Sequence, residues 1–450
     1  MMERYLFVPR PVFQISPFSV LAAAVFALAA CAQSNVAVPP VETQPGQQVE
    51  PALVQTAPAE PKGIDPASLN GVRVAIAVPL SGPEAGVGRD LLDAAQLALF
   101  DFRPENFELR VYDTAGNSVI AASAAQRAQQ DGVSLFLGPL FADAVSATAD
   151  AVRPAGIPIY AFSSDRLVAG DGVYVAGFFP EAQVARVVDF AARQGMFRFA
   201  VLAPNDAYGN RINTAVSDAV VDAGGKVVDG RFYPLDNHGM TETVRSLARY
   251  AERAAELKTE KAQLAGKDDP ISKLALERLD TLDTFGDVGF EALILPEGGE
   301  RVLQLAPLLA FFDIDPASVK LLGLWIWDDP ELGKEPSMLG AWFAAPPRAS
   351  RLRFEERFRQ AYGRAPDRLA TLAYDGVALA AVLAQTAQPG VAPFARDRLE
   401  NTDGFAGVDG IFRLHPNGEV QRGLSVLEVK RDGPQEIDPA PISFRDSPMN

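Results

Sequence analysis

Apolar strand-like runs alternate with helical segments along most of the chain, and this alternation limits the possible folds more than any other feature. The run 72–80 (VRVAIAVPL) precedes a segment, 89–100, in which apolar residues recur at helical spacing. The same order then repeats along the sequence. Strands that are apolar throughout are typical of parallel sheets covered by helices on both faces. The sequence therefore predicts an α/β protein with doubly wound sheets.

The expected elements fall into two successive series. The first has strands at 72–80, 107–113, 134–138, 157–162 and 173–178, with helices at 89–100, 119–130 and from Asp143. The second has helices at 181–194 and 209–223, with strands at 199–204, 226–233, 291–296 and 320–326. Two such series predict two doubly wound lobes that face each other across a central cleft.

Two segments depart from the alternation. Residues 241–284 are rich in charged helix formers and predict a helical insertion on the second lobe, split by GKDDP at 266–270. Its charges are typical of a solvated helix face rather than a binding patch. Residues 410–433 predict consecutive β-hairpins, with Asn417-Gly418 and Asp432-Gly433 as the turns.

The only cysteine, Cys31, follows an apolar run near the start of the chain. A basic start, the run 18–30 and small residues at its end predict a secretory signal peptide over residues 1–30. The sequence LAAC at 28–31 resembles a bacterial lipobox, which implies lipidation of Cys31; ordinary cleavage that leaves a free thiol is the alternative. Ala32 in place of Asp implies sorting to the outer membrane under the lipoprotein rule. The proline- and glutamine-rich residues 31–70 predict a disordered tether between the lipid and the folded body.

The overall composition removes other classes of function. The formal net charge is −16, so the chain would repel nucleic acid, and no nucleic-acid partner is expected. An apolar fraction of 48% indicates a globular protein with a sizeable core. Apart from the N-terminal run, no segment has the length and apolarity of a membrane span.

Motifs that would indicate an enzyme are missing from the sequence. The two histidines, His238 and His415, have no companions at metal-ligand spacing, so no metal site is expected. Neither a G-x-S-x-G elbow nor a G-x-G-x-x-G or Walker A motif occurs. We therefore expect no catalytic residues and no cofactor.

Candidate ligand contacts lie where strands end, because ligands of open α/β sheets bind outside the carboxyl ends of the strands. The loops concerned are 81–88, 113–117, 138–143, 163–165, 205–210 and 296–300. The residues chosen in them are Ser81, Gly82, Asp113, Leu140, Asp143, Ser163, Ser164, Asp165, Tyr208 and Glu297. Each loop is equally consistent with ordinary turn chemistry, which uses the same residue types.

Several segments resemble type I periplasmic binding proteins of the branched-chain amino-acid receptor kind. They are PLSGPEAGVGRDLLDAAQLAL, YDTAGN, LFLGPLFADAV, IPIYAFSSD, FAVLAPNDAYGNRI, AVVDAGGKVV and LATLAYDGVALA. The resemblance implies three crossings between the lobes, near Pro180, near Pro346 and in the final hairpins. Lobe I would comprise 71–179 and 347–407, lobe II 180–346, and the crossing hairpins and tail 408–450.

A narrower resemblance links the chain to penicillin-binding-protein activators of the LpoA/LppC type. APNDAYGNRI, EALILPEGGERV and GFAGVDGIFRLHPNGEVQRGL carry it, together with the lipobox and the tether. It implies an outer-membrane lipoprotein that binds and stimulates a bifunctional peptidoglycan synthase. Such activators can carry a helical-repeat domain ahead of the body, where this sequence has only the tether.

The alternative is a lipid-anchored receptor of an ABC importer for amino acids, amides or peptidoglycan fragments. Amino-acid receptors hold the ligand carboxylate with small hydroxyl residues in two loops of lobe I. Here the loop 138–143 lacks that hydroxyl, and Asp143 and Asp165 add negative charge beside the expected carboxylate position. This departure favours a fold reused for partner binding over transport of a free amino acid.

Overall fold

The structure is a computed structural model that describes residues 71–234 and 237–444. The predicted signal peptide, the lipidation of Cys31 and the tether up to residue 70 lie outside the described residues. The last residues of the predicted tail, 445–450, also lie outside them.

Lobe I is built around a five-stranded sheet in which every neighbouring pair is parallel. Its strands are β1 (Val72–Val78), β2 (Phe107–Asp113), β3 (Leu135–Leu137), β4 (Ile159–Ala161) and β5 (Val173–Val175), in the order β2-β1-β3-β4-β5. The strand order reverses between β1 and β3. In sheets of this kind such a reversal opens a crevice at the carboxyl ends of the strands.

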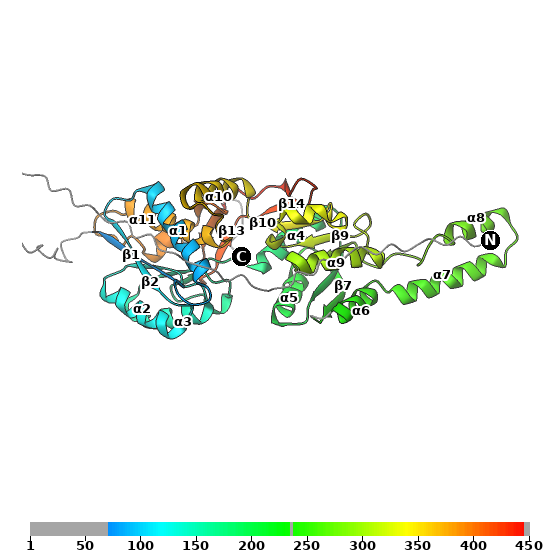
Figure 1. The fold of residues 1–450 in the computed structure, drawn as a ribbon, viewed down its shortest axis with the longest axis horizontal. Helices are drawn as coiled ribbons and strands as arrows, with labels where there is room; N and C mark the ends of the chain where they lie inside the picture. Colours follow the sequence, from blue (N-terminus) through cyan, green and yellow to red (C-terminus); the bar gives the residue numbers. More distant parts are fainter. Residues whose placement is uncertain (1–70, 235–236, 445–450) are drawn as a thin grey trace, which may run out of the picture. The chain divides into compact units, whose positions relative to one another are not determined.

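Helices cover both faces of this sheet, which explains why β3, β4, β5 and most of β1 are apolar and buried, whereas the edge strand β2 is not (Figure 1). On one face lie α1 (Ala85–Phe102) and α11 (Ala370–Gln385), and on the other α2 (Ser118–Gln130) and α3 (Ala142–Val152). Val74 and Ile76 pack toward α1 and α11, whereas Ala75 and Ala77 pack toward α2 and α3. Phe354 and Phe358 of α10 (Arg348–Tyr362) pack against α1, so residues distant in sequence complete lobe I.

Lobe II is built around a seven-stranded sheet, with the order β15-β14-β10-β9-β8-β6-β7. Its strands are β6 (Arg198–Pro204), β7 (Lys226–Tyr233), β8 (Ala292–Ile294), β9 (Lys320–Gly323), β10 (Trp342–Ala345), β14 (Ser425–Glu428) and β15 (Gln435–Asp438). Helices α4 (Pro180–Arg193) and α5 (Ala207–Asp222) cover one face, and α6 (Asn237–Leu247) and α9 (Gly299–Phe311) cover the other. β14 runs antiparallel to both β10 and β15, so one edge of the otherwise parallel lobe II sheet is antiparallel.

A small third sheet and a buried ionic network lie beside the passage of the chain from lobe I to lobe II. The sheet consists of β11 (Phe405–Gly407), β12 (Gly410–Leu414) and β13 (Val420–Arg422). Arg422 Nη1 lies 3.2 Å from Asp375 Oδ2 in α11, and Arg368 Nη2 lies 2.8 Å from Asp409 Oδ1. Arg422 also donates to the carbonyl of Ala176, between β5 and α4. These bonds join segments that are far apart in the sequence.

The predicted helical insertion contains α6, α7 (Tyr250–Ala265) and α8 (Pro270–Leu279). Figure 1 shows α7 and α8 as a pair that extends from lobe II. The buried Arg253 holds the base of α7, because it donates to the carbonyl of Gly286 at 2.9 Å and lies 3.5 Å from Asp313. The shorter elements are α12 (Arg396–Leu399) and 3-10 turns at Arg153–Ala155, Arg166–Val168, Trp325–Trp327, Pro330–Lys334 and Pro336–Met338.

Both lobes begin with the same close approach of a helix to the preceding strand. A Cβ added at Gly88 in α1 would lie 1.8 Å from the Pro79 carbonyl oxygen, and one at Gly209 in α5 would lie 1.9 Å from the Pro204 carbonyl oxygen. The turn after β1 is shorter than the predicted segment 81–88, because α1 begins at Ala85 rather than at residue 89. The first turns of α1 and α5 are therefore held close to the ends of β1 and β6.

Two strands end earlier than predicted, and both ends matter for the cleft. The strand expected at 173–178 stops at Val175, and the strand expected at 320–326 stops at Gly323. Trp327 packs over Gly323, where an added Cβ would lie 2.2 Å from the indole ring. The chain turns there into the 3-10 segment Trp325–Trp327.

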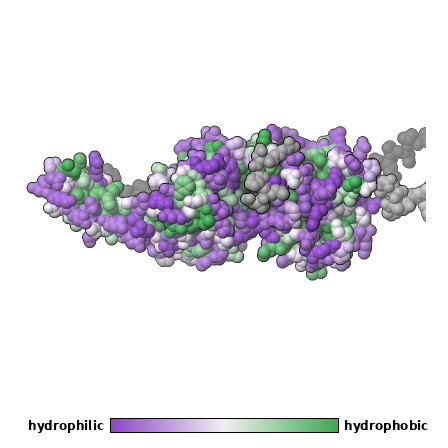
Figure 2. Space-filling view, turned by 180° about the vertical axis from the view of Figure 1, so that it is seen from behind, coloured by the Kyte–Doolittle hydropathy of each residue, from purple (hydrophilic) through white to green (hydrophobic). Residues whose placement is uncertain are grey.

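The surface of the described residues is largely polar on the face shown in Figure 2, where apolar side chains form separate small groups. Within this part of the chain no helix has the combination of length and apolarity that a membrane crossing requires.

Candidate functional site

A cavity of about 1010 Å³ lies between the two lobes, at the carboxyl ends of their strands. This volume is at the upper end of the range common for small-molecule sites. Its apolar lining consists of Val87, Leu140, Phe141, Ala142, Phe162, Leu167, Gly177, Phe178, Pro180, Ala207, Pro296, Leu324, Ile326 and Leu369. The remaining lining residues are Glu84, Ser163, Ser164, Asp165, Tyr208, Arg211, Glu297 and Trp325.

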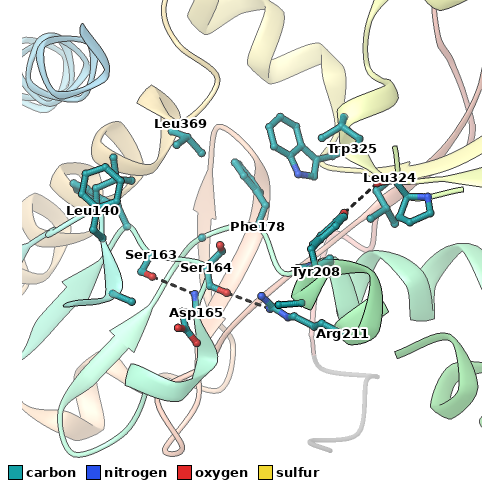
Figure 3. A pocket seen from close by; sticks show the side chains of 18 of the residues that line it. Leu140, Ser163, Ser164, Asp165, Phe178, Tyr208, Arg211, Leu324, Trp325 and Leu369 are labelled. Atoms are coloured by element: carbon teal, nitrogen blue, oxygen red, sulfur yellow. Dashed lines mark hydrogen bonds between the residues drawn. The ribbon is translucent and has the colours of Figure 1, made fainter. Parts of the chain in front are cut away.

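The polar residues on the lobe I wall mainly support their own loop. The Ser163 hydroxyl accepts from the backbone N–H of Asp165 at 3.1 Å, and the Asp165 carboxylate accepts from the N–H of Leu167 at 2.9 Å. Ser163 is buried, whereas Ser164 is exposed. Figure 3 shows these residues on one side of the cleft, with Tyr208 and Arg211 on the other.

Aromatic side chains from both lobes meet at the inner end of the cleft. The rings of Phe178 and Trp325 lie with their centroids 5.4 Å apart. The backbone N–H of Trp325 donates to the side-chain oxygen of the buried Gln183 at 2.8 Å, which fixes the turn after β9. The Tyr208 hydroxyl donates to the carbonyl of Pro296 at 3.3 Å, and burial, followed by the charge of Glu297, raises the pKa of Tyr208 to about 12.

The only cation that lines the cavity within the described residues, Arg211, is already bound. Its guanidinium forms a bidentate pair with Glu181 from α4, with Nη2 2.9 Å from Oε2. The same nitrogen donates to the carbonyl of Ser164 in lobe I at 3.2 Å. Burial raises the pKa of Glu181, but the hydrogen bond and charge of Arg211 outweigh it, and the net shift is downward. Arg211 therefore links the lobes and is neutralised.

Glu297 has much weaker compensation for its charge. Its side chain is 16% exposed, and the nearest guanidinium nitrogen, on Arg301, lies 3.9 Å away. Tyr233 donates its hydroxyl to the carboxylate, and Trp327 Nε1 donates to the Glu297 carbonyl at 2.5 Å. Burial raises the pKa of Glu297 despite the opposing hydrogen bond from Tyr233. This acid is held in place and is short of positive charge.

The structure brings together six of the residues chosen from the sequence. These are Leu140, Ser163, Ser164, Asp165, Tyr208 and Glu297, all of which line the cavity. A ligand role for each of them remains a prediction.

Four other choices lie outside the cavity lining. Asp113 accepts from the backbone N–H groups of Leu80, Ser81 and Ala115 at 2.8, 3.3 and 2.7 Å. Burial raises the pKa of Asp113, but these bonds and the Ser81 hydroxyl outweigh it and lower the pKa overall. Asp113 and Ser81 thus organise the loops at the end of β1, and Gly82 forms the turn there with φ of +83°. Asp143 is exposed in the first turn of α3, where a helix dipole favours an acid.

Sequence reasoning missed Phe178, Arg211, Trp325 and Leu369 as lining residues. Trp325 was placed inside a strand, and Phe178 stands at the end of another that proved shorter. Arg211 directly follows the expected loop 205–210, near the start of α5, and Leu369 directly precedes α11, which comes from much later in the chain. A search of the first helical turn after each strand would have found Arg211.

The described residues contain no cluster of three or more His, Cys, Asp or Glu side chains with the geometry of a metal site. The arrangement offers a partly open binding space with aromatic walls and with carboxylates at its edge.

The sequence profile of the periplasmic binding protein family matches residues 71–434. This chain belongs to that family. A structure described as a branched-chain amino acid ABC transporter from Rhodospirillum rubrum has the same fold, with a TM-score of 0.64 and 20% identity over 82% of this chain and 100% of that one. The predicted α/β class, with two doubly wound lobes and a central cleft, is confirmed.

Two curated proteins are similar over shorter lengths. An uncharacterised protein of Rickettsia prowazekii is 23% identical over 200 residues, which are 44% of this chain and 53% of that protein. The penicillin-binding protein activator LpoA of Pectobacterium parmentieri is 32% identical over 112 residues, which are 25% of this chain and 16% of that protein. The matches thus span about half of the first relative and about a sixth of the second.

Proposed function

We propose that this periplasmic binding protein binds and activates a bifunctional penicillin-binding protein, a peptidoglycan synthase, and catalyses no reaction itself. The observation that carries the proposal is the 32% identity with the activator LpoA over 112 residues. The family places the chain outside the cytoplasm, where peptidoglycan is assembled. We further propose a lipid on Cys31 as its attachment to the periplasmic face of the outer membrane.

The charges of the cleft support this proposal over amino-acid transport. The carboxylate of a free amino acid loses water when it enters a cleft, and a free cation would compensate for that loss. Here Arg211, the only cation among the described residues that line the cavity, is already paired with Glu181. The loop 138–143 also lacks the hydroxyl residue with which amino-acid receptors hold the ligand carboxylate.

Activation would act through a difference in affinity. A binding partner shifts the equilibrium between inactive and active synthase only by the ratio of its affinities for the two states. We therefore expect the chain to bind the active conformation of the synthase more tightly than the inactive one.

The test is to add the purified full chain, in detergent, to a cognate bifunctional synthase and to measure glycan polymerisation and peptide crosslinking. We expect a saturable complex and a several-fold rise in at least one rate. An importer receptor with the same fold, at the same concentration, controls for non-specific stabilisation of the synthase. Absence of a complex together with unchanged rates would refute the activator role.

The second candidate function is a receptor for an ABC importer, and the cavity between the lobes is the observation that favours it. In that case some amino acid, amide or peptidoglycan fragment should raise the melting temperature of the chain. A ligand at 100 times its Kd adds about 2.7 kcal/mol to the free energy of unfolding. A screen of these three classes without any shift would leave the activator role as the better account.

A further inference from the structure

We propose that the cleft is a binding site for a small organic cation with an aromatic or aliphatic body, and that the Glu297 carboxylate receives its positive charge. The inference goes beyond the proposed activation of a synthase, and it does not depend on that role. It rests on which charges around the cavity are already paired and which are not.

Two arginines, one at the cavity wall and one beside its aromatic rings, are not available to a ligand. Arg211 is held by both oxygens of Glu181 and by the Ser164 carbonyl. Arg368 lies behind the aromatic wall, with its guanidinium carbon 4.5 Å from the ring centroid of Phe178, and both its terminal nitrogens bind Asp409. An anionic ligand that took either guanidinium would leave the carboxylate of Glu181 or Asp409, both largely buried, without its partner, which is costly.

The carboxylates that line the cavity, in contrast, lack close positively charged partners within the described part of the chain. Among the residues that the structure describes, neither Glu84 nor Asp165 has an ion-pair partner, and Glu297 has only Arg301 at 3.9 Å. Glu297 is also largely enclosed, with its side chain 16% exposed. A ligand ammonium or guanidinium at this position would supply the missing counter-charge in a site partly shielded from water, where such a bond is stronger than at a surface.

The neighbouring rings suit the rest of such a ligand. Tyr208, Phe178 and Trp325 line the same cavity as Glu297, together with the aliphatic side chains Leu140 and Leu369. Aromatic faces attract organic cations and also bury apolar groups. A cavity of about 1010 Å³ has room for a body of one or more rings beside the charged group.

For a binding protein this assignment has a consequence for the movement of the lobes. Glu297 and Tyr208 belong to lobe II, whereas Leu140 and Leu369 belong to lobe I. A cation that contacts both walls favours the arrangement of the lobes in which both contacts exist. Under the proposed activator role, the cation would thus be an effector of the activator.

The test uses matched probes that share a body and differ in charge. Binding of benzylamine and benzoate, and of tryptamine and indole-3-acetate, to the full chain is measured by calorimetry at pH 7.5 and low salt. We expect each amine to bind at least tenfold more tightly than its carboxylate counterpart. Equal affinity within a pair, preference for the carboxylate, or no binding of either amine would overturn the inference.

Two matched variants identify the anchor. Glu297→Gln keeps the size of the side chain and removes its charge, and we expect amine affinity to fall at least tenfold. Glu300→Gln makes the same change on the exposed first turn of α9, outside the cavity lining, and should leave the affinity unchanged. Both variants must keep the melting temperature of the parent. If a folded Glu297→Gln variant binds tryptamine as tightly as the parent does, Glu297 is not the anchor.

These outcomes are separable from those for synthase activation. Amine binding without any effect on a synthase would leave this inference standing and remove the activator role. Synthase activation by a chain that binds none of the amines would do the reverse.

Discussion

Two regions of the molecule place carboxylates close to aromatic rings and arginines, and they treat the charges differently. Beside the passage between the lobes, Asp375 and Asp409 are fully buried, and each lies within 3.2 Å of a guanidinium nitrogen. In the cleft, Glu297 has its nearest guanidinium at 3.9 Å, and Asp165 has no ion-pair partner among the described residues. In the first region each carboxylate is paired with an arginine, and these pairs hold distant segments of the fold together. In the cleft the carboxylates lack close arginine partners within the described residues, so their negative charge could be balanced by a bound ligand.

The burial of the first network explains why its pairing is complete. A charged group removed from water is tolerated only when a partner and hydrogen bonds replace the lost solvation. Arg422 achieves this with Asp375, the Tyr160 hydroxyl and the Ala176 carbonyl. The cleft acids remain in partial contact with water and can stay unpaired at a lower cost.

The largest effect is expected from breaking the buried network. Arg422→Ala removes the counter-charge of Asp375 and leaves a fully buried carboxylate with only the backbone N–H of Val408, at 2.7 Å, as a hydrogen-bond partner among the described residues. We expect the free energy of unfolding to fall by about 3–5 kcal/mol, measured by urea denaturation. Lys334→Ala removes an exposed partner of Glu331 and should cost at most about 1 kcal/mol. Similar losses for both variants would contradict the distinction between the two kinds of charge.

The same network predicts a pH dependence. Burial raises the pKa of Asp375 to about 6, and the charge of Asp409 adds to this, whereas Arg422 opposes it. Since folding raises this pKa above its ordinary value of 3.8, the folded protein takes up a proton more readily than the unfolded chain. The contribution of Asp375 to stability therefore grows as the pH falls from 7 toward 4.

Asp375→Asn removes this proton uptake, so a comparison of the parent with this variant measures the contribution of Asp375 alone. The parent should gain about 1 kcal/mol relative to the variant when the pH falls from 7 to 5, in free energies of unfolding from denaturant titrations. Because the other acids are shared, their contributions cancel in the difference. A difference that stays constant or shrinks over this interval would show that the Asp375 pKa is not raised by folding.

The comparison also shows where sequence reasoning succeeds. The alternation of apolar strands and helices was sufficient for the α/β class and the two lobes, because period and length are local properties of the chain. The loops after β3, β4 and β8 could be assigned to the cleft, since the carboxyl ends of parallel strands share one edge. Leu140, Ser163 and Glu297 were found in this way.

The pairing of charges could not be predicted from the sequence. Glu181 and Arg211 are far apart in the sequence and meet only because α4 and α5 cover the same face of the lobe II sheet. Asp113 was chosen as a ligand contact, but backbone N–H groups of neighbouring loops consume its carboxylate. Whether a carboxylate already has a hydrogen-bond or ion-pair partner depends on differences of about an ångström in how the elements pack. Residue type and spacing in the sequence do not determine these distances.

A third prediction concerns the paired cation of the cleft, Arg211, which a single substitution should leave unpaired. Glu181→Gln removes the negative charge that neutralises Arg211 and frees the guanidinium at the cavity wall. We expect benzoate affinity to rise about tenfold and benzylamine affinity to fall, because a free cation attracts the carboxylate and repels the amine. Calorimetry with both probes measures the change.

The control for this variant is Asp189→Asn, which makes the equivalent change on α4 outside the cavity lining. It should leave both affinities as they are in the parent. An unchanged benzoate affinity in folded Glu181→Gln would mean that Arg211 does not face the ligand.

The smallest effect concerns the hydroxyl that holds Glu297. Tyr233→Phe removes the hydrogen bond that lowers the pKa of Glu297, so this pKa, already raised by burial, should rise further. Loss of one such bond costs about 1 kcal/mol of stability. Glu297 would then be charged only at higher pH, and the pH at which amine binding reaches half its maximum should move upward.

Tyr208→Phe separates this effect from a general loosening of the aromatic wall. Its hydroxyl donates to the Pro296 carbonyl and not to a carboxylate, so its removal should leave the midpoint of the pH profile in place. A purely structural role for Tyr233 would lower amine affinity equally at every pH. A shift of the midpoint that is confined to Tyr233→Phe would show that the Tyr233 hydroxyl lowers the pKa of Glu297 and so keeps this acid charged for an amine, whereas Asp375 and Asp409 are held by their own arginines.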